Sequence, residues 1–358
     1  MREYLVTLLI SAALCYLITP FVRTLAIRFG AVAKIRGRDI HTTPTARWGG
    51  VAMWMAMALT FLIVNHLPLV GKSFGRESQG IFLASSAIVL LGMLDDRFQL
   101  DALTKLAGQV FVAGILLIYG IQILWLPING VITLPSSIGQ LTTVLIVIIT
   151  INAVNFIDGM DGLAAGIVAI AGIAFFAFAY LLAVEYGFSR AGTPSLITAV
   201  LVGLCIGFLP HNAHPARIFM GDSGSMLLGL LLASAAVTLT GQVDPNAISV
   251  ASSGPTLLPL LLPFAVLAIP LADLLLAVAR RVKAGKSPFA PDNQHLHHRL
   301  LKAGNSQLRS ALILYLATAA IAFPVTILAF APWWIALLSA LALIMVTLFL
   351  SYRGKVKK

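Results

Sequence analysis

Long apolar stretches alternate with short polar segments along the whole chain, and this pattern predicts the fold class. A helix that crosses the hydrocarbon core of a bilayer needs about 20 mostly apolar residues. Eleven segments approach that length, and several of them are short for a full crossing: 4–22, 48–66, 80–94, 103–122, 140–155, 162–184, 195–210, 223–241, 256–278, 309–328 and 333–351. The pattern predicts an all-α polytopic membrane protein whose residues 1–358 form a single integral-membrane domain.

Composition agrees with this fold class. The chain is 59% hydrophobic and 10% charged, whereas soluble domains carry roughly 25% charged residues. We expect Tyr4–Val22 to be a retained first helix, because it is long enough to span the membrane. Cys15 and Cys205 lie in different apolar segments and predict no disulfide. The net charge of +11 favours anionic lipids and substrates over nucleic acid, because the sequence shows no folded basic domain.

Lysine and arginine are distributed unevenly between the predicted loops. Cytoplasmic loops of membrane proteins carry an excess of these residues. With the N-terminus outside, twenty of the 24 lie on the inner side, and the other four are Arg2, Lys72, Arg76 and Arg190. The bias predicts a cytoplasmic C-terminus, which eleven spans also require. On the outer side, the apolar segment 123–139 contains Gly and Pro and predicts a small hairpin.

With this orientation, the candidate chemistry gathers at the cytoplasmic face. Asp95 and Asp96 end the third apolar segment, where two adjacent carboxylates repel one another and are costly to desolvate. A solvated helix end is the alternative interpretation of this pair. Lys105 follows at the start of the next helix and could reach back to the acids. The pattern favours a cation or phosphate site.

A second motif has polar residues at every third position. If the segment is helical, neighbouring members share a face; the four are Asn152, Asn155, Asp158 and Asp161. Helix capping would explain one of these residues but not all four. The motif therefore favours a binding site.

The third motif is Phe219-Met-Gly221-Asp222-Ser223-Gly-Ser, directly before a predicted helix. Asp222 and Ser223 are also good helix caps, so capping is the competing interpretation. The functional interpretation is a phosphate at the helix N-terminus, an Asp222 oxygen ligand for Mg²⁺ and a base stacked on Phe219.

The longest inner loop carries His295, His297, His298 and Arg299. Three histidines so close together can indicate zinc, but donors for phosphate or sugar oxygens fit better beside an arginine. A solvated basic loop is the third possibility. The segment from His41 to Arg47 gives a weaker loop-to-helix signal. The acid Asp273, close to the inner end of a predicted helix, is also unusual, although Arg280 could simply pair with it.

Taken in order, these motifs resemble the polyprenyl-phosphate N-acetylhexosamine-1-phosphate transferase family. The resemblance covers nearly the whole chain: the Asp-Asp pair, Asn-x-x-Asn-x-x-Asp-Gly-x-Asp-Gly, Phe-Met-Gly-Asp-Ser-Gly-Ser and the histidine loop all occur in the family's order. His-Leu-His-His-Arg is similar to the His-x-His-His signature of the WecA/TagO-type branch, which uses UDP-GlcNAc. The MraY-type branch, which uses UDP-MurNAc-pentapeptide, typically has three consecutive histidines, and Leu296 interrupts such a run here.

The resemblance implies roles for the candidate residues. It implies Mg²⁺ on Asp222 and Asn155, with Mn²⁺ as a substitute, and a catalytic set of Asp95, Asp96, Lys105, Asp158, Asp161, His295, His297 and His298. It implies substrate binding by His41, Arg47, Asn152, Asn155, Phe219, Gly221 and Arg299. The implied partners are a UDP-N-acetylhexosamine and a polyprenyl phosphate, in a bacterial inner membrane with the active site facing the cytoplasm.

The implied reaction transfers GlcNAc 1-phosphate from UDP-GlcNAc to undecaprenyl or decaprenyl phosphate and releases UMP. Another UDP-N-acetylhexosamine donor or an MraY-type reaction remains an alternative within the family. An ion-coupled transporter is the non-enzymatic alternative, but it would place acids near the middle of helices and show inverted repeats. The sequence leaves open the carrier length, a one-step or a covalent two-step mechanism, and the oligomeric state, a homodimer included.

Overall fold

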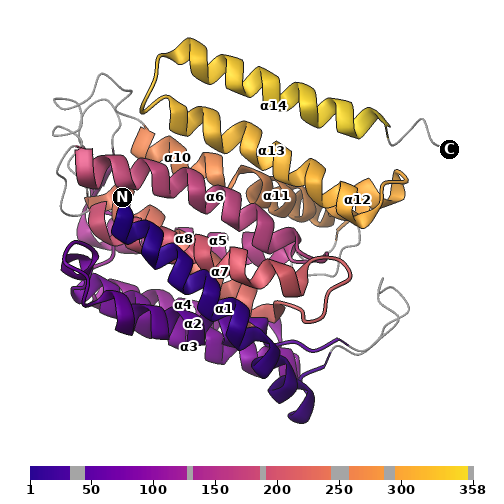
Figure 1. Cartoon of the computed structure of the whole chain (residues 1–358), viewed down its shortest axis with the longest axis horizontal. Coiled ribbons are helices and arrows are strands. Elements are labelled where there is room, and N and C mark those ends of the chain that lie inside the picture. The colour runs from indigo at the N-terminus through magenta and orange to yellow at the C-terminus, as the bar shows by residue number, and fades with distance from the viewer. Residues whose placement is uncertain (33–44, 127–131, 186–190, 243–257, 286–294, 354–358) are drawn as a thin grey trace.

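The computed structural model describes residues 1–32, 45–126, 132–185, 191–242, 258–285 and 295–353. Nearly all of them are helical (Figure 1). The helices are α1 (Arg2–Arg28), α2 (Gly49–Val64), α3 (Arg76–Phe98), α4 (Ala102–Ile118), α5 (Ser136–Ile157), α6 (Leu163–Tyr180), α7 (Gly192–Asn212), α8 (Gly221–Gln242), α10 (Leu258–Val266), α11 (Ala268–Lys283), α12 (Leu296–Lys302), α13 (Gln307–Ile327) and α14 (Trp333–Arg353). Two short helical turns, η1 (Val70–Ser73) and η2 (Leu181–Glu185), and strands β1 (Trp125–Leu126) and β2 (Ile132–Thr133) complete the list.

The predicted apolar segments coincide with these helices. Within the described ranges, eight helices are long and apolar enough to cross a membrane: α1, α3, α5, α6 with part of η2, α7, α8, α13 and α14. Helices α2 and α4 are apolar but shorter. The predicted segment 256–278 is divided between α10 and α11 at Leu267, where Pro263 and Pro270 remove backbone donors on either side. The chain is a polytopic membrane protein, as predicted, and eleven crossings remain a prediction.

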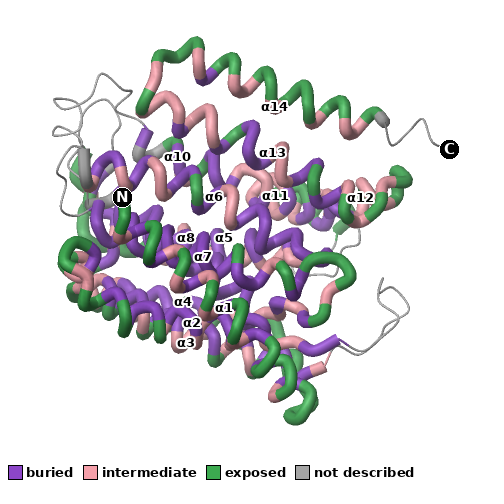
Figure 2. Tube along the Cα trace, in the orientation of Figure 1, coloured by how far each residue is buried: buried purple, intermediate pink, exposed green. Residues whose placement is uncertain are grey.

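Helix α8 lies at the centre of the bundle. It packs against α2, α3, α5, α6, α7 and α10. Its most apolar stretch of 18 residues is completely buried (Figure 2). Its apolar residues therefore contact other helices rather than lipid. A helix that is apolar on every side is typical of such a buried position.

Helix α14 is the opposite case. It packs on α13 at the edge of the bundle, and most of its side chains are exposed. The exposed residues include Leu338 and Leu348, and the aromatic residues Trp333, Trp334 and Tyr352 lie near its two ends. Exposed apolar residues between terminal aromatic residues are typical of a helix in contact with lipid.

The first turn of α8 is packed unusually closely by two neighbouring helices. A Cβ atom on Gly50 of α2 would lie 2.1 Å from the Gly224 backbone nitrogen. A Cβ atom on Gly92 of α3 would lie 2.3 Å from the Ser223 Cα atom. Small residues allow helix backbones to approach in membranes, and here they bring the ends of α2 and α3 against the start of α8.

The two ends of the bundle carry different elements. Strands β1 and β2 pair antiparallel, which confirms the hairpin predicted within 123–139. Helix α12 lies at the end of the bundle where α14 ends, whereas α1 begins at the other end (Figure 1). We call the first of these the α12 end.

Candidate active site at the α12 end

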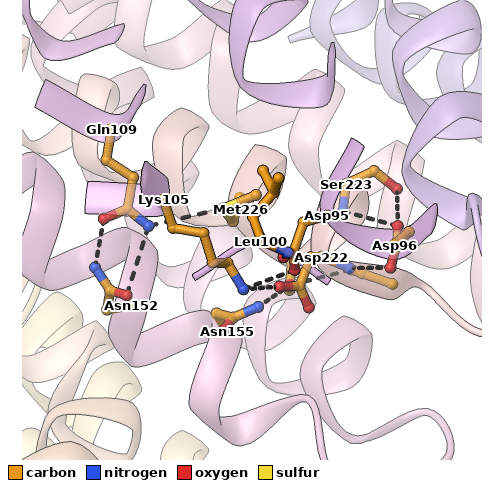
Figure 3. Close-up of polar contacts among 12 residues, drawn as sticks. Asp95, Asp96, Leu100, Lys105, Gln109, Asn152, Asn155, Asp222, Ser223 and Met226 are labelled. Atoms are coloured by element: carbon orange, nitrogen blue, oxygen red, sulfur yellow. Dashed lines mark hydrogen bonds and ion pairs between the residues drawn. The ribbon is translucent and has the colours of Figure 1, made fainter. Parts of the chain in front are cut away.

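Lys105 links two carboxylates where α3, α4 and α8 meet (Figure 3). Its Nζ lies 2.7 Å from Asp95 Oδ2 and also contacts Asp222 Oδ2. Asp101 caps α4 by accepting hydrogen bonds from the Leu103 and Thr104 backbone nitrogens at 3.0 Å, which places Lys105 in the first turn. The prediction that Lys105 reaches back to the acidic pair is confirmed.

The two members of the acidic pair have different surroundings. Asp95 uses Oδ1 to accept a hydrogen bond from the Leu100 nitrogen at 2.8 Å, and its Oδ2 contacts Lys105. Asp96 accepts hydrogen bonds from the Asp222 nitrogen at 3.0 Å and from Ser223 N and Oγ at 3.2 and 2.9 Å. Asp95 therefore faces the lysine, whereas Asp96 is bonded to the start of α8.

This arrangement corrects one part of the sequence interpretation. The first backbone N–H groups of α8 were expected to bind a phosphate or to be capped by Asp222 or Ser223. Instead Asp96, which comes from α3, accepts the hydrogen bonds of both residues. A carboxylate also complements the positive end of the helix dipole. Asp222 is thereby left to point its own carboxylate at Lys105.

Gly221 begins α8 and lies directly against this cap. Its φ of +71° is in the left-handed region, and a Cβ atom would lie 2.5 Å from Asp96 Oδ2. Glycine is therefore required at this position by both backbone conformation and space.

The polar residues of α5 take two different directions. Asn155 donates from Nδ2 to Ser225 Oγ at 2.9 Å and so lies against the first turn of α8. Asn152, one turn earlier, donates to Gln109 Oε1 at 2.7 Å and to its own Ile148 carbonyl at 2.8 Å. The structure thus brings Asn155 to the site, whereas Asn152 pairs with the buried Gln109 side chain behind the site.

The two acids after α5 also separate. Asp161 is buried and accepts hydrogen bonds from His214 Nδ1 at 2.8 Å and the Ala216 nitrogen at 3.1 Å, so it holds the segment between α7 and α8. Asp158 is half-buried just beyond α5. Burial raises the pKa of Asp158 to about 8, and the Asp222 and Asp96 carboxylates add to this effect. Asp158 therefore belongs electrostatically to the Lys105 site.

The segment before α2 runs beside the segment before α8. Phe219 donates its backbone N–H to the Ala46 carbonyl at 2.8 Å and accepts from the Gly49 nitrogen at 3.1 Å. This pairing brings Arg47 Nη1 to 4.0 Å from Asp96 Oδ1. His41 lies outside the described residues.

The histidines form a second group, on α12 and the residue before it. His297 is buried, and a Cβ atom on Gly159 would lie 2.4 Å from its Nε2, so the absence of a side chain at Gly159 admits the ring. The His298 ring lies 4.2 Å from the His297 ring, and Arg299 is exposed. Because Gly159 follows Asp158, the turn after α5 connects the histidine group with the Lys105 site.

His297 has an unusual environment. Burial, together with the neighbouring His298 and His295 rings, lowers the pKa of His297 to about 3. Neither ring nitrogen has a hydrogen-bond partner among the described residues. The ring is therefore neutral at physiological pH.

The donor set suits a hard cation. Asp95 and Asp222 approach closely enough to share the ammonium group of Lys105, and Asn155, whose Nδ2 is used by Ser225, has its amide oxygen left as a ligand. Mg²⁺ prefers one or two protein oxygens together with water and substrate phosphates. Among the described residues, no group of three or more His, Cys, Asp or Glu side chains is placed to hold a metal ion.

Comparison with known proteins identifies the family of this chain. Residues 78–240, from α3 to α8, match glycosyl transferase family 4. The decaprenyl-phosphate N-acetylglucosaminephosphotransferase of Mycolicibacterium smegmatis is 42% identical over 90% of this chain and 81% of its own length. The chain belongs to glycosyl transferase family 4. The resemblance drawn from the sequence motifs is confirmed.

Other relatives of this family 4 protein carry similar names. The decaprenyl-phosphate N-acetylglucosaminephosphotransferase of Mycobacterium tuberculosis is 43% identical over 90% of this chain and 82% of its own length. The undecaprenyl-phosphate alpha-N-acetylglucosaminyl 1-phosphate transferase of Escherichia coli is 29% identical over 88% of this chain and 82% of its own length.

Two residues that contact the candidate site residues have no role in the sequence analysis. Gln109 is buried and pairs with Asn152; its spacing of four residues from Lys105 on a helix was the available signal. Ser225 lies within a recognised motif, but its contact with Asn155 depends on how α5 meets α8. The sequence singled out Asp273 without a role, and the structure places its carboxylate beside His295.

Proposed function

We propose that this family 4 protein transfers GlcNAc 1-phosphate from UDP-GlcNAc to decaprenyl or undecaprenyl phosphate, giving polyprenyl-diphospho-GlcNAc and UMP. The observation that carries the proposal is the Lys105 site, in which Asp95 and Asp222 both contact the Lys105 ammonium group. The chain that holds this site is 42% identical to a decaprenyl-phosphate N-acetylglucosaminephosphotransferase.

The reaction exchanges one phosphorus–oxygen bond for another. An oxygen of the polyprenyl phosphate attacks the phosphorus attached to the sugar, and the bond from that phosphorus to the bridging oxygen breaks, so that UMP leaves with the bonding electrons. The acceptor phosphate is already largely deprotonated at pH 7. The protein's main task is then to hold two anions together, which requires positive charge.

Lys105 and Arg47 supply positive charge from this chain's own residues. The Lys105 ammonium group lies between the two carboxylates, and Arg47 stands beside Asp96. We assign Lys105 and Asp95 to the attacking phosphate and the diphosphate. Asp96, predicted to be catalytic, supports the site by fixing the start of α8.

Asp222 and Asn155 would hold Mg²⁺, with Mn²⁺ as a substitute. When bound, the ion would neutralise charge on the phosphate oxygens. Both residues stand where α8 and α5 touch, through Asn155 and Ser225. Removal of divalent cations with EDTA should abolish UMP release, and added Mg²⁺ should restore it.

The remaining site residues bind the donor in this proposal. Phe219, Asn155 and Asp158 contact the nucleotide, and His295, His297, His298 and Arg299 face the diphosphate and the N-acetyl sugar. Asn152, Asp161 and Gly221 maintain the site through Gln109, the α7–α8 segment and Asp96. His41 is proposed as a binding residue on its motif alone.

We further propose that residues 1–358 form one domain with eleven spans in a bacterial inner membrane. The N-terminus lies outside, and the α12 end faces the cytoplasm, where the UDP-sugar is available. The distribution of lysine and arginine supports this orientation, as does the separation of the start of α1 from the end of α14 (Figure 1).

The test is UMP release by the detergent-purified protein with Mg²⁺ and polyprenyl phosphate. UDP-GlcNAc, UDP-GalNAc and UDP-MurNAc-pentapeptide are compared as donors, with Asp222→Ala as the inactive variant. We expect lipid-dependent UMP from UDP-GlcNAc alone and none from Asp222→Ala. Turnover of another donor would keep the reaction class and overturn the donor, and no UMP from any donor would overturn the function.

A further inference from the structure

Asp273 is a buried acid that the proposed reaction has not used. It lies in the middle of α11 with 1% of its surface exposed. A buried carboxylate within a membrane protein is costly unless its oxygens are bonded. Its partners lie 22 and 23 residues later in the chain, at the start of α12.

Both Asp273 oxygens are engaged there. Oδ1 accepts a hydrogen bond from the Leu296 backbone nitrogen at 2.8 Å, and Oδ2 lies 2.9 Å from His295 Nδ1. One carboxylate thus caps α12 and fixes the histidine that precedes the helix. The contact with Oδ2 also determines the chemistry of the ring.

A carboxylate only accepts hydrogen bonds. His295 Nδ1 must therefore carry the hydrogen in this contact, whether the ring is neutral or charged. In the neutral ring, Nε2 then has the lone pair and can accept a hydrogen bond. Asp273 in this way determines which His295 nitrogen is a donor and which is an acceptor.

The position of the His295 ring relates this effect to the site. The ring lies 5.9 Å from the Phe156 ring, and Phe156 adjoins Asn155 at the end of α5. It is also parallel to the His297 ring at 5.9 Å, with 4° between the planes. His295 is therefore oriented from one side by Asp273 and lies beside residues assigned to the donor site.

We propose that Asp273 is a positioning residue for the transferase reaction: it fixes the tautomer of His295 so that Nε2 presents a lone pair to an O–H or N–H group of the bound substrate. This inference rests on the proposed function, because it assumes that the histidine group faces substrate. Asp273 itself does not touch the substrate.

Asp273→Asn separates this role from capping. The Leu296 N–H can only donate, so the amide oxygen must face it, and the cap is retained. The amide nitrogen then faces His295 Nδ1 and donates to it, which moves the ring hydrogen to Nε2. The variant keeps the shape of the residue 273 side chain. It exchanges the donor and the acceptor nitrogen of the His295 ring.

The matched control is Glu3→Gln, which changes another carboxylate that accepts backbone hydrogen bonds, from the Leu69 and Val70 nitrogens, at the end of the bundle opposite α12. We expect Asp273→Asn to lower kcat/KM for UMP release by at least about tenfold at an unchanged melting temperature. Glu3→Gln should keep wild-type kcat/KM. Wild-type activity in Asp273→Asn would overturn the proposal.

A double-mutant cycle shows whether Asp273 acts through His295. In a His295→Gln background, Asp273→Asn should change kcat/KM by less than about twofold, because the ring it orients is gone. An equal loss in both backgrounds would show an effect independent of His295 and would overturn the proposal.

A ¹⁵N spectrum of the histidine side chains reports which ring nitrogen carries the hydrogen. A loss of the α12 cap alone would not change this property. The His295 signals, assigned by their absence in His295→Gln, should show hydrogen on Nδ1 in the wild type and on Nε2 in Asp273→Asn. An unchanged tautomer would overturn the proposal. If the wild type released no UMP, the proposed function would fail, whereas this spectrum would still test the contact between Asp273 and His295.

Discussion

Lys105 is the residue on which the charge balance of the site depends. Its ammonium group is shared by Asp95 and Asp222, which come from α3 and α8. Without it, two carboxylates in close proximity would repel each other and the anionic substrates alike. The same residue therefore holds three helices together and supplies charge to the reaction.

Lys105→Met should remove activity. We expect kcat/KM for UMP release to fall by about 100-fold or more, since a preorganised positive group near the transferred phosphate is lost. Lys72→Met, at an exposed position in η1, is the control and should keep wild-type activity. Equal activity in both variants would contradict the role of Lys105.

His297 should give the folded protein a specific sensitivity to acid. Its pKa of about 3 lies below the ordinary value of 6.5. Between these values the unfolded chain binds a proton that the folded protein does not, so stability falls as the pH falls through 6.5 toward 3. The slope is about 1.4 kcal/mol per pH unit.

His297→Phe removes this titration and both ring nitrogens that have no partner among the described residues. Its melting temperature should fall less than that of the wild type between pH 7.5 and pH 5. His66→Phe, at an exposed position, should follow the wild type. Parallel curves for wild type and His297→Phe would show that the buried ring is not the cause.

At the scale of elements, the start of α8 is built by its neighbours. Asp96 of α3 caps it, and Gly50 of α2 and Gly92 of α3 allow backbone contact. Asn155 of α5 reaches Ser225 one turn further along. The position of Asp222 is thus a property of four helices together.

Gly50→Ala should disturb this junction. The added Cβ atom would lie 2.1 Å from the Gly224 nitrogen, so α2 and α8 must move apart, at a cost of about 1–3 kcal/mol. Gly114→Ala is the control, because nothing lies within 4 Å of its added Cβ atom and alanine favours a helix. Thermal unfolding in detergent should show a lower midpoint for Gly50→Ala alone, and an equal midpoint would refute the close contact.

At the scale of the whole molecule, the candidate site residues gather at one end of the bundle. The Lys105 site and the histidine group lie together at the α12 end, whereas α14 and other outer helices present apolar residues to lipid. The proposed reaction requires a water-soluble donor and a lipid acceptor to meet at one site, and the end of a membrane bundle adjoins both the aqueous phase and the bilayer.

The proposed orientation can be tested with a membrane-impermeant maleimide. Cys15 and Cys205 are buried, so they should give little background. Lys72→Cys should be labelled in intact cells, and Lys302→Cys, at the exposed last residue of α12, only after permeabilisation. Labelling of Lys302→Cys in intact cells would reverse the orientation.

The sequence by itself predicted the fold class and most residues of the candidate site. Hydrophobic length predicts helices because membrane-spanning backbone must bond internally. The motifs predicted the pairing of Lys105 with the acids, since a polar residue at a helix end has few charged groups within reach. These features depend on short stretches of chain, so they can be recognised without a structure.

The tertiary structure decided which of these residues meet. Three kinds of contact depend on how separate parts of the chain pack. Asp95 contacts Lys105 whereas Asp96 contacts the start of α8. Asn152 pairs with Gln109, and Asp273 contacts His295. Adjacent or regularly spaced residues look equivalent in sequence, but a rotation of about 100° per residue sends their side chains toward different neighbours. Only the packing of the helices determines which neighbours those are.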